Sequence, residues 1–538
     1  MVLTGTRAGT GEEVFGIDLG TTYSAIAWLD SHGKPETLGN LDGRVTTPSV
    51  VYFAESEETY QVGEHAKEWL KDEPQRVVEK VKEHMGDPDW RYTTPEGREY
   101  SAIEISAIIL KKLVEDAAVQ TGCPVKNVVI TCPAYFGTNE HEATKEAGRH
   151  AGLNVVEVID EPVAAAYAYG ITAKEAQTVL VYDLGGGTFD VTIIKIDPMD
   201  ATAPIRVVAK GGDPQLGGKQ WDEAFVQLLA KKWGEGTDET LDLESDPGFK
   251  AELTSKVERH KISLSQLTAV TVPGVRGKSL KVTREEFDAE TSGLLEQTII
   301  KTRQTLDEAA KMAGVETFEF DTLLCVGGSS LMPQVAARLR AEFGKEPKLK
   351  NPNECVAQGA AVWAGLRAVG GGQTKNILGK SYGIKAVRRK PGGDREDVVS
   401  FLLLKNQPQD DEGYTDNRHF HADEDDQHTI DIRVMESEAG LWEEAKADAE
   451  KRGEDVDPNG WRVFPYDDLT MAEIKTGSLI LPPGCKEGDI IAVTYRVDSG
   501  MVLHVTAVHE RSGQKVELQC TGNVKKPEKP MSKDMVFI

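Results

Sequence analysis

One short segment occurs twice in this chain, and this repeat constrains the fold more than any other feature. The two copies read FGIDLGTTYSAIAWLD and LVYDLGGGTFDVTIIKID, so that Asp18 corresponds to Asp183 and Gly20 to Gly185. Each copy has an apolar run, then Asp-Leu-Gly, a turn of small residues and a second apolar run. A single such turn would carry little weight, because short motifs match by chance. Two copies in the same strand–turn–strand context predict two similar lobes with a cleft between them.

Both turns are built from small residues. A triphosphate needs backbone N–H groups brought close to it, and side chains obstruct that approach. A pair of ordinary glycine hairpins is the simpler interpretation, but a hairpin alone does not require an acid at the same place in both copies. The residues expected to hold phosphate are Gly20, Thr21 and Thr22 in the first turn and Gly185, Gly186, Gly187 and Thr188 in the second.

Three acids accompany the turns. Asp18 and Asp183 precede them, and Asp190 follows the second turn. Mg²⁺ prefers oxygen ligands in octahedral geometry and keeps several waters. The three carboxylates are therefore predicted to hold Mg²⁺, largely through water. For Asp190 a solvated hairpin acid is the alternative interpretation.

The pattern of apolar segments divides the chain into two parts. Strand-like and helix-like segments alternate over residues 14–369, which predicts an α/β domain. This domain contains both copies of the repeated turn, so we expect it to bind the nucleotide. Short apolar or alternating runs with turns between them predict an all-β sandwich over residues 381–523. The other segments are predicted to be a disordered N-terminus, a linker, a helical insertion and a C-terminal tail, at residues 1–13, 370–380, about 438–465 and 524–538.

Composition excludes several classes of partner. The formal net charge of −26 predicts repulsion of nucleic acid and of anionic membranes. The six cysteines form no CxxC pair, which favours a reduced environment. No apolar run is long enough for a membrane helix, and residues 1–16 lack the apolar core of a signal peptide. A cytoplasmic location is therefore expected.

Further segments appear in a characteristic order: DLGTTYS, PAYF, DEPVAAAYAYG, DLGGGTFDV, VGGSS and AQGAAV. With these segments the chain resembles the DnaK-type (70-kDa heat-shock) chaperone family over residues 14–368, and more weakly over 381–523. The resemblance implies an actin-like, two-lobed ATPase domain with duplicated ribonuclease H-like sheets, followed by a β-sandwich that binds polypeptide. It also implies hydrolysis of ATP to ADP and phosphate, with Mg²⁺ as cofactor and K⁺ as a further candidate ion. J-domain and nucleotide-exchange proteins would be candidate partners.

The resemblance assigns roles position by position. Lys82 falls at the family's γ-phosphate lysine, and Glu161 at the glutamate that orders the metal waters and the nucleophile. Without the resemblance, Lys82 would be interpreted as a solvated charge on a helix, and Glu161 as an ordinary acid at a helix N-terminus. Thr21 and Thr188 match hydroxyls near phosphate or the attacking water. The remaining residues expected to contact nucleotide are Tyr23, Gly217, Gly218, Glu258, Lys261, Ser265, Gly327, Gly328, Ser329 and Asn353.

The adenine site departs from the family pattern. The family usually has two arginines that sandwich the base, and here these positions are Ile262 and Leu331. Apolar flanks still bury a purine face at roughly 25 cal/mol per Å². They lose guanidinium stacking worth about 0.5–2 kcal/mol. ATP binding is therefore expected to persist but to be weaker.

The residues that in this family couple nucleotide binding to the β domain also differ from the family pattern. Pro133 matches the proline of the family's interdomain switch, but its arginine partner is replaced by His141. The linker holds only Ile377 and Leu378 where the family has a longer apolar run, and the family's helical lid has no counterpart. Weakened coupling and fast exchange of bound peptide are therefore expected.

Three other functions remain open at this point. The first is a dedicated ATP-dependent assembly or scaffold protein with one fixed partner and weakened interdomain allostery. The second is a small-molecule kinase, because sugar kinases share the fold and fold alone does not decide function. The third is an actin-like filament, which the long β domain disfavours.

Overall fold

The computed structural model divides the chain into two compact units. The first consists of Met1–His84, Arg91–Tyr135 and Lys145–Thr374, and the second of Met85–Trp90, Phe136–Thr144 and Lys375–Ile538. The structure describes residues 13–55, 59–170, 175–200, 204–235, 243, 246–349, 351–368, 374–375, 377–389, 394–405, 414–437, 463–466, 470–498, 502–520 and 536–537.

The first copy of the repeat lies inside a 6-stranded sheet of the first unit. The strand order is β11-β10-β1-β2-β3, and β4 pairs with β2. β1 is parallel to β10 and antiparallel to β2, so the first Asp-Leu-Gly turn closes a hairpin. The strands are β1 (Val14–Asp18), β2 (Tyr23–Leu29), β3 (Pro35–Leu38), β4 (Thr47–Pro48), β10 (Asn127–Cys132) and β11 (Asn154–Asp160).

The second copy lies in the same place in a second sheet. Here the order is β18-β17-β12-β13-β14, and β12 is parallel to β17 and antiparallel to β13. The strand that carries Asp-Leu-Gly thus has equivalent neighbours in both sheets, which confirms the predicted α/β fold with duplicated sheets. The strands are β12 (Gln177–Leu184), β13 (Phe189–Ile196), β14 (Ile205–Asp213), β17 (Thr322–Val326) and β18 (Lys348–Leu349), and β19 (Thr374–Lys375) follows later in the chain.

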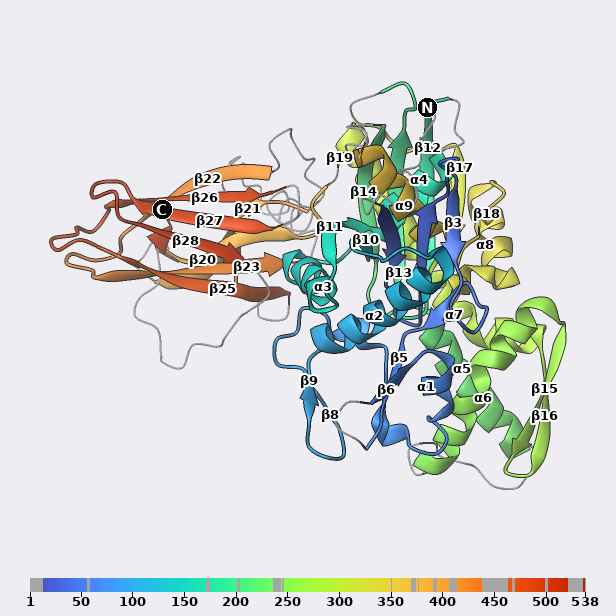
Figure 1. Ribbon diagram of the computed structural model, residues 1–538. Coiled ribbons are helices and arrows are strands. Elements are labelled where there is room, and N and C mark those ends of the chain that lie inside the picture. The colour runs from blue at the N-terminus through green and yellow to red at the C-terminus, as the bar shows by residue number, and fades with distance from the viewer. Residues whose placement is uncertain are drawn as a thin grey trace. The chain divides into compact units, whose positions relative to one another are not determined.

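Helices cover these sheets because their apolar faces match the buried strands. Helix α9 packs on β1 and β2, α4 contacts β12 and β13, and α7 contacts β13 and β14 (Figure 1). Helices α4 and α9 also pack directly on each other at Gly359, where a Cβ atom would lie 1.7 Å from the Ala164 carbonyl oxygen. The bounds are α2 (Ala102–Thr121), α3 (Thr138–His150), α4 (Glu161–Gly170), α7 (Arg284–Ala313), α8 (Pro333–Phe343) and α9 (Cys355–Ala368).

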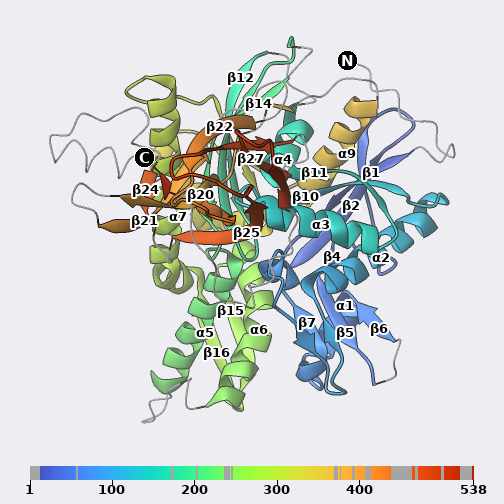
Figure 2. The ribbon, with the colours of Figure 1, turned by 90° about the vertical axis from the view of Figure 1, so that its left-hand side faces the viewer.

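Two smaller groups of elements complete the first unit. In one, α1 packs on the three-stranded sheet β6-β5-β7, and in the other α5 and α6 lie beside the β15–β16 hairpin (Figure 2). The first group comprises α1 (Glu64–Glu68), β5 (Val50–Phe53), β6 (Tyr60–Val62), β7 (Val77–Glu79), β8 (Tyr92–Thr93), β9 (Glu99–Tyr100) and the 3₁₀ turns Pro74–Arg76 and Val81–His84. The second comprises α5 (Gly218–Glu235), α6 (Pro247–Gln266), β15 (Ala269–Val275) and β16 (Lys278–Thr283).

The second unit is mainly a 10-stranded sheet with one large and one smaller apolar core cluster. Its order is β24-β21-β20-β29-β22-β26-β27-β28, with β23 joining β20 to β25. Strands β26 and β27 alternate buried and more exposed residues, so one face of each enters the core. The strands are β20 (Ser381–Arg389), β21 (Arg395–Leu403), β22 (Tyr414–His421), β23 (Thr429–Ser437), β24 (Val463–Pro465), β25 (Met471–Ile480), β26 (Ile490–Val497), β27 (Leu503–His509), β28 (Lys515–Cys520) and β29 (Val536–Phe537).

Several predicted segments fall partly or wholly outside the described residues. These are residues 1–12, residues 370–373 and 376 of the linker, residues 438–462 of the expected helical insertion, residues 521–523 at the end of the β domain, and residues 524–535 and 538 of the tail. The last residues of the expected insertion, Val463–Pro465, form a strand that pairs with β21, and its first two residues, Val463 and Phe464, are buried. Branched and aromatic side chains of this kind suit a half-buried strand. Within the expected linker, Ile377 and Leu378 are buried, and Leu378 belongs to the core of the second unit. Among the described residues no helix is long and apolar enough to cross a membrane.

Candidate nucleotide and metal site

The two repeated turns touch each other. A Cβ atom added to Gly186 would lie 2.0 Å from Thr22 Oγ1, and one added to Gly187 would lie 3.0 Å from Thr21 Cγ2. Any side chain in the second turn would therefore displace the first. The glycines are needed for this contact, and the backbones of both turns stay within reach of one small ligand.

A third loop supports the second turn. The backbone N–H of Gly218 donates to the Gly185 carbonyl at 2.9 Å, and that of Lys219 donates to Gly186 at 2.8 Å. A Cβ atom on Gly217 would lie 2.4 Å from the Gly187 carbonyl carbon. The start of α5 thus lies directly on the second turn, so the structure brings Gly217 and Gly218 to it.

The loop after β17 reaches the same place. Gly327 has a φ of +78°, and a Cβ atom there would lie 2.5 Å from Asp183 Oδ1. Asn353 Oδ1 would lie 3.0 Å from a Cβ atom on Gly328, and Ser329 Oγ lies beside Gly218. These predicted residues therefore surround the second turn.

The three predicted acids lie at the turns, where Asp183 and Asp190 are buried and Asp18 is half-buried. Asp183 and Asp190 face each other in register across β12 and β13, with 7% and 1% of their surfaces exposed. Asp18 ends β1 and accepts a hydrogen bond from Thr131 Oγ1 at 3.3 Å. Among the described residues, Asp190 Oδ1 is a buried oxygen without a hydrogen-bond partner. Leaving such an atom unpaired costs roughly 1–3 kcal/mol, so this set of oxygens suits a hard, hydrated cation.

A buried ion pair lies beside these acids. Lys82, on the 3₁₀ turn Val81–His84, donates to Glu161 at the start of α4, and both side chains are almost fully buried. Burial opposes the charge on Lys82, but the carboxylates of Glu161 and Asp18 outweigh it and raise the pKa of the ammonium group. The lysine therefore carries a fixed positive charge among four acids. The structure confirms neither residue's role, but it places both next to the predicted metal ligands.

Burial also controls the protonation of the acids. It raises the pKa of Asp18 from 3.8 to about 7, with the charge of Glu161 adding to this and Lys82 opposing it. Burial, followed by the charge of Glu161, also raises the pKa values of Asp183 and Asp190 well above their ordinary range. A divalent cation would favour the charged forms and lower all three pKa values.

The predicted adenosine residues form a second cluster around α6. Tyr23 donates its hydroxyl to Glu258 Oε1 at 3.1 Å, and Lys261 Nζ donates to the Gly218 carbonyl at 2.8 Å. Ser265 donates back to the carbonyl of Lys261 at 3.4 Å, so its hydroxyl is used within the helix here. Ile262 and Leu331 are 52% and 43% exposed, which leaves two apolar side chains open to solvent.

Sequence reasoning missed two bridges across this region. Lys67 Nζ donates to Glu258 Oε2 at 2.5 Å, and Lys219 Nζ donates to Glu83 Oε2 at 3.2 Å. Each pair joins residues far apart in the chain, and although Glu258 was predicted to lie at the nucleotide site, no motif marks Lys67 as its partner. Pairings of this kind leave no signal in a single sequence, because isolated lysines and glutamates are usually solvated.

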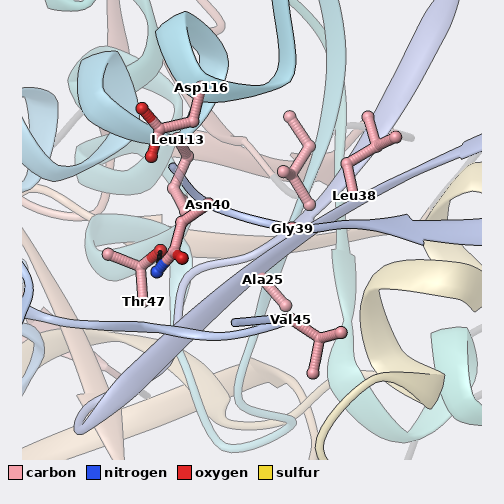
Figure 3. A pocket seen from close by; sticks show the side chains of 9 residues that line it. Ala25, Leu38, Gly39, Asn40, Val45, Thr47, Leu113 and Asp116 are labelled. Atoms are coloured by element: carbon pink, nitrogen blue, oxygen red, sulfur yellow. Dashed lines mark hydrogen bonds between the residues drawn. The ribbon is translucent and has the colours of Figure 1, made fainter. Parts of the chain in front are cut away.

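A small hollow lies elsewhere in the first unit (Figure 3). It lies between β2, β3 and α2, with Asn40, Thr47 and Asp116 among its lining residues, and it leaves no room for a water-sized sphere. None of the predicted site residues lines it. The hollow is a packing defect and has no part in the nucleotide site.

The raised pKa values predict how stability depends on pH. In the folded protein Asp18 keeps its proton up to about pH 7, whereas in the unfolded chain it releases it near its ordinary value of 3.8. The free energy of unfolding should therefore fall as the pH rises through this window. As the pH rises, we expect the melting temperature without nucleotide to fall. We expect the increase in melting temperature on adding Mg²⁺ and ATP to become larger over the same range.

Asp18→Asn should reduce the dependence of the melting temperature on pH. Asp307→Asn, at an exposed acid of α7, should leave this dependence unchanged. Melting curves between pH 4 and pH 8 measure both. Equal slopes in the wild type and Asp18→Asn would contradict the role of burial at this carboxyl.

Comparison with known proteins agrees with this geometry. A family model described as Hsp70 protein matches residues 14–94 and 87–449. The chain is 35% identical, over 542 residues, to Chaperone protein DnaK of Thermosipho melanesiensis, covering 97% of this chain and 82% of that protein. It is 34% identical to the proteins of the same name from Thermotoga neapolitana and Thermotoga maritima, covering 97% and 96% of this chain and 82% of each relative. The chain belongs to the Hsp70 family.

Proposed function

We propose that this protein is an ATP-hydrolysing molecular chaperone that binds polypeptide segments through its second unit. The observation that carries the proposal is the buried Lys82–Glu161 pair, which lies where two glycine turns meet, among two buried acids and one half-buried acid. Buried charges are expensive unless they are paired or bind an ion. A binding site for a metal–phosphate group explains why so many of them lie together.

Each part of the site has a distinct task. The backbone N–H groups of the two turns bind the phosphate chain, because the glycines let it approach closely. Asp18, Asp183 and Asp190 bind Mg²⁺ largely through water, and the ion, when bound, neutralises charge on the phosphates. Lys82 offsets charge on the terminal phosphate. Glu161, held in place by Lys82, orients the attacking water and accepts its proton.

The nucleoside is held by the cluster around α6. Tyr23, Lys67 and Glu258 form a hydrogen-bonded group between β2, α1 and α6, and Lys261 ties α6 to the loop at Gly218. Ile262 and Leu331 cover the adenine through apolar contact. Because both side chains are exposed as the structure has them, a base lying on them would bury apolar surface.

The second unit is the part proposed to bind polypeptide. The curated relatives named above are called Chaperone protein DnaK, and the matched region extends into this unit. An extended peptide is recognised by main-chain hydrogen bonds and by pockets for alternate side chains. These relatives do not favour the dedicated assembly protein. J-domain and exchange-factor partners, K⁺ and weakened coupling stay predictions.

The proposal is tested by separating hydrolysis from peptide binding. Lys82→Met should lower the rate of phosphate release by about 10²–10³-fold, because charge on the phosphates is no longer offset. Binding of a labelled unfolded peptide should remain. The matched control is Lys111→Met, at an exposed position of α2. Phosphate release and fluorescence anisotropy are the two measurements.

Removing one partner of a buried ion pair can itself unfold a protein. The double variant Lys82→Met/Glu161→Gln removes both charges, and it should keep the wild-type circular dichroism spectrum while remaining inactive. Transfer of the γ-phosphate to a small molecule, or full activity in Lys82→Met, would refute the proposed function.

The apolar adenine contacts generate a separate prediction. The double variant Ile262→Arg/Leu331→Arg should bind ATP more tightly by about 0.5–2 kcal/mol, or roughly two- to thirty-fold, because guanidinium groups stack on the base. Both positions are exposed, so the fold should tolerate the change. Calorimetric titration with ATP measures the effect.

Ile300→Arg, at an exposed position of α7, is the control and should leave affinity unchanged. If the double variant binds ATP no more tightly than the control, these two residues do not contact the base.

A further inference from the structure

Three potential metal ligands come together at one end of the second unit. Cys485 and Asp489 lie in the connection between β25 and β26, and His509 is the last residue of β27. Strands β26, β27 and β28 are neighbours in the sheet, so these loops are adjacent (Figure 1). One ligand atom from each residue lies within 4.8 Å of the others, and Cys485 and His509 are 1% and 0% exposed.

We propose that Cys485, Asp489 and His509 bind a divalent transition-metal ion of the zinc class. Thiolate sulfur, imidazole nitrogen and carboxylate oxygen are the ligands that Zn²⁺ takes in proteins. A thiolate and a carboxylate together also balance the two positive charges of the ion. Three protein ligands leave a fourth position for water or another small ligand, as in zinc sites that are not purely structural.

The spacing requires only a small adjustment. Zinc–ligand bonds of about 2.0–2.3 Å at tetrahedral angles place ligand atoms about 3.3–3.8 Å apart. His509 Nε2 and Asp489 Oδ2 are already 3.3 Å apart. The remaining distances are at most 4.8 Å. A tetrahedral site places sulfur about 3.5 Å from a nitrogen or oxygen ligand, so the sulfur must approach by at most about 1.3 Å.

The surrounding residues orient the ligands. His509 Nδ1 is 2.7 Å from Ser512 Oγ, and that hydroxyl donates in turn to Gln514 Oε1 at 3.3 Å. If Nδ1 donates to the serine, the lone pair of Nε2 points toward Asp489. The Lys486 backbone N–H donates to Asp489 Oδ2 at 2.9 Å and holds the carboxylate. Such outer contacts are typical of metal-binding histidines and carboxylates.

Two features disfavour binding of the ion, and neither prevents it. Arg511 lies 2.7 Å from Asp489 Oδ2, but its side chain is 46% exposed and can move into solvent. The thiol proton of Cys485 must also leave, so the ion replaces one S–H bond with one metal–sulfur bond and releases one proton. Binding should therefore weaken as the pH falls.

Co²⁺ serves as the probe, because a cobalt–thiolate bond gives a charge-transfer band that weak surface sites lack. We expect the full chain, after treatment with chelator, to bind one equivalent of Co²⁺ with this band, and Zn²⁺ to displace it. Cys485→Ser should abolish the band. The matched control is Cys520→Ser, at a fully buried cysteine of the same unit, which should retain it.

Ser512→Ala should weaken Co²⁺ binding by about 10–100-fold, as expected for the loss of an outer hydrogen bond to a histidine ligand. If Cys485→Ser alters the circular dichroism spectrum, the Co²⁺ affinities of Ser512→Ala and Asp489→Asn provide the test instead. Absence of the thiolate band in the wild type, or its persistence in Cys485→Ser, would show that the three residues form only a hydrogen-bonded network. An unchanged Co²⁺ affinity in both Ser512→Ala and Asp489→Asn would contradict the proposed set of ligands.

Discussion

The contact between two glycine turns is the constraint on which the rest of the nucleotide site depends. Gly186 and Gly187 have no side chains, and this alone lets the second turn lie against Thr21 and Thr22 of the first. The contact brings together the strand ends that carry the acids. It also explains why the third loop uses glycine at position 217, since that loop lies on the backbone of the second turn.

The charges near the turns follow from this packing. Once the strand ends meet, Asp18, Asp183 and Asp190 have little water around them, and burial raises their pKa values. Lys82 and Glu161 meet the same low-polarity surroundings as a pair. Burying these carboxyl groups therefore costs free energy in the protein without ligand. A bound metal–nucleotide complex would lower that cost, so ligand binding should stabilise the fold.

Much of this arrangement was predictable from the sequence, because it depends on local patterns. The repeated Asp-Leu-Gly segment predicted two equivalent hairpins, and the acids at Asp18 and Asp183 marked their ends. The bridge from Lys67 to Glu258 and the cluster at Cys485 were not predictable, since each joins segments brought together only by folding. The strand at Val463–Pro465 was also missed, because a helical pattern precedes it.

The most direct test of the shared nucleotide site is a crystal structure of the protein with Mg²⁺ and a non-hydrolysable ATP analogue. We expect one phosphate chain to contact the backbone of residues 20–22 and of residues 185–188 together, with the ion beside Asp18, Asp183 and Asp190. A nucleotide that contacted only one of the two turns, or that bound elsewhere in the chain, would contradict it.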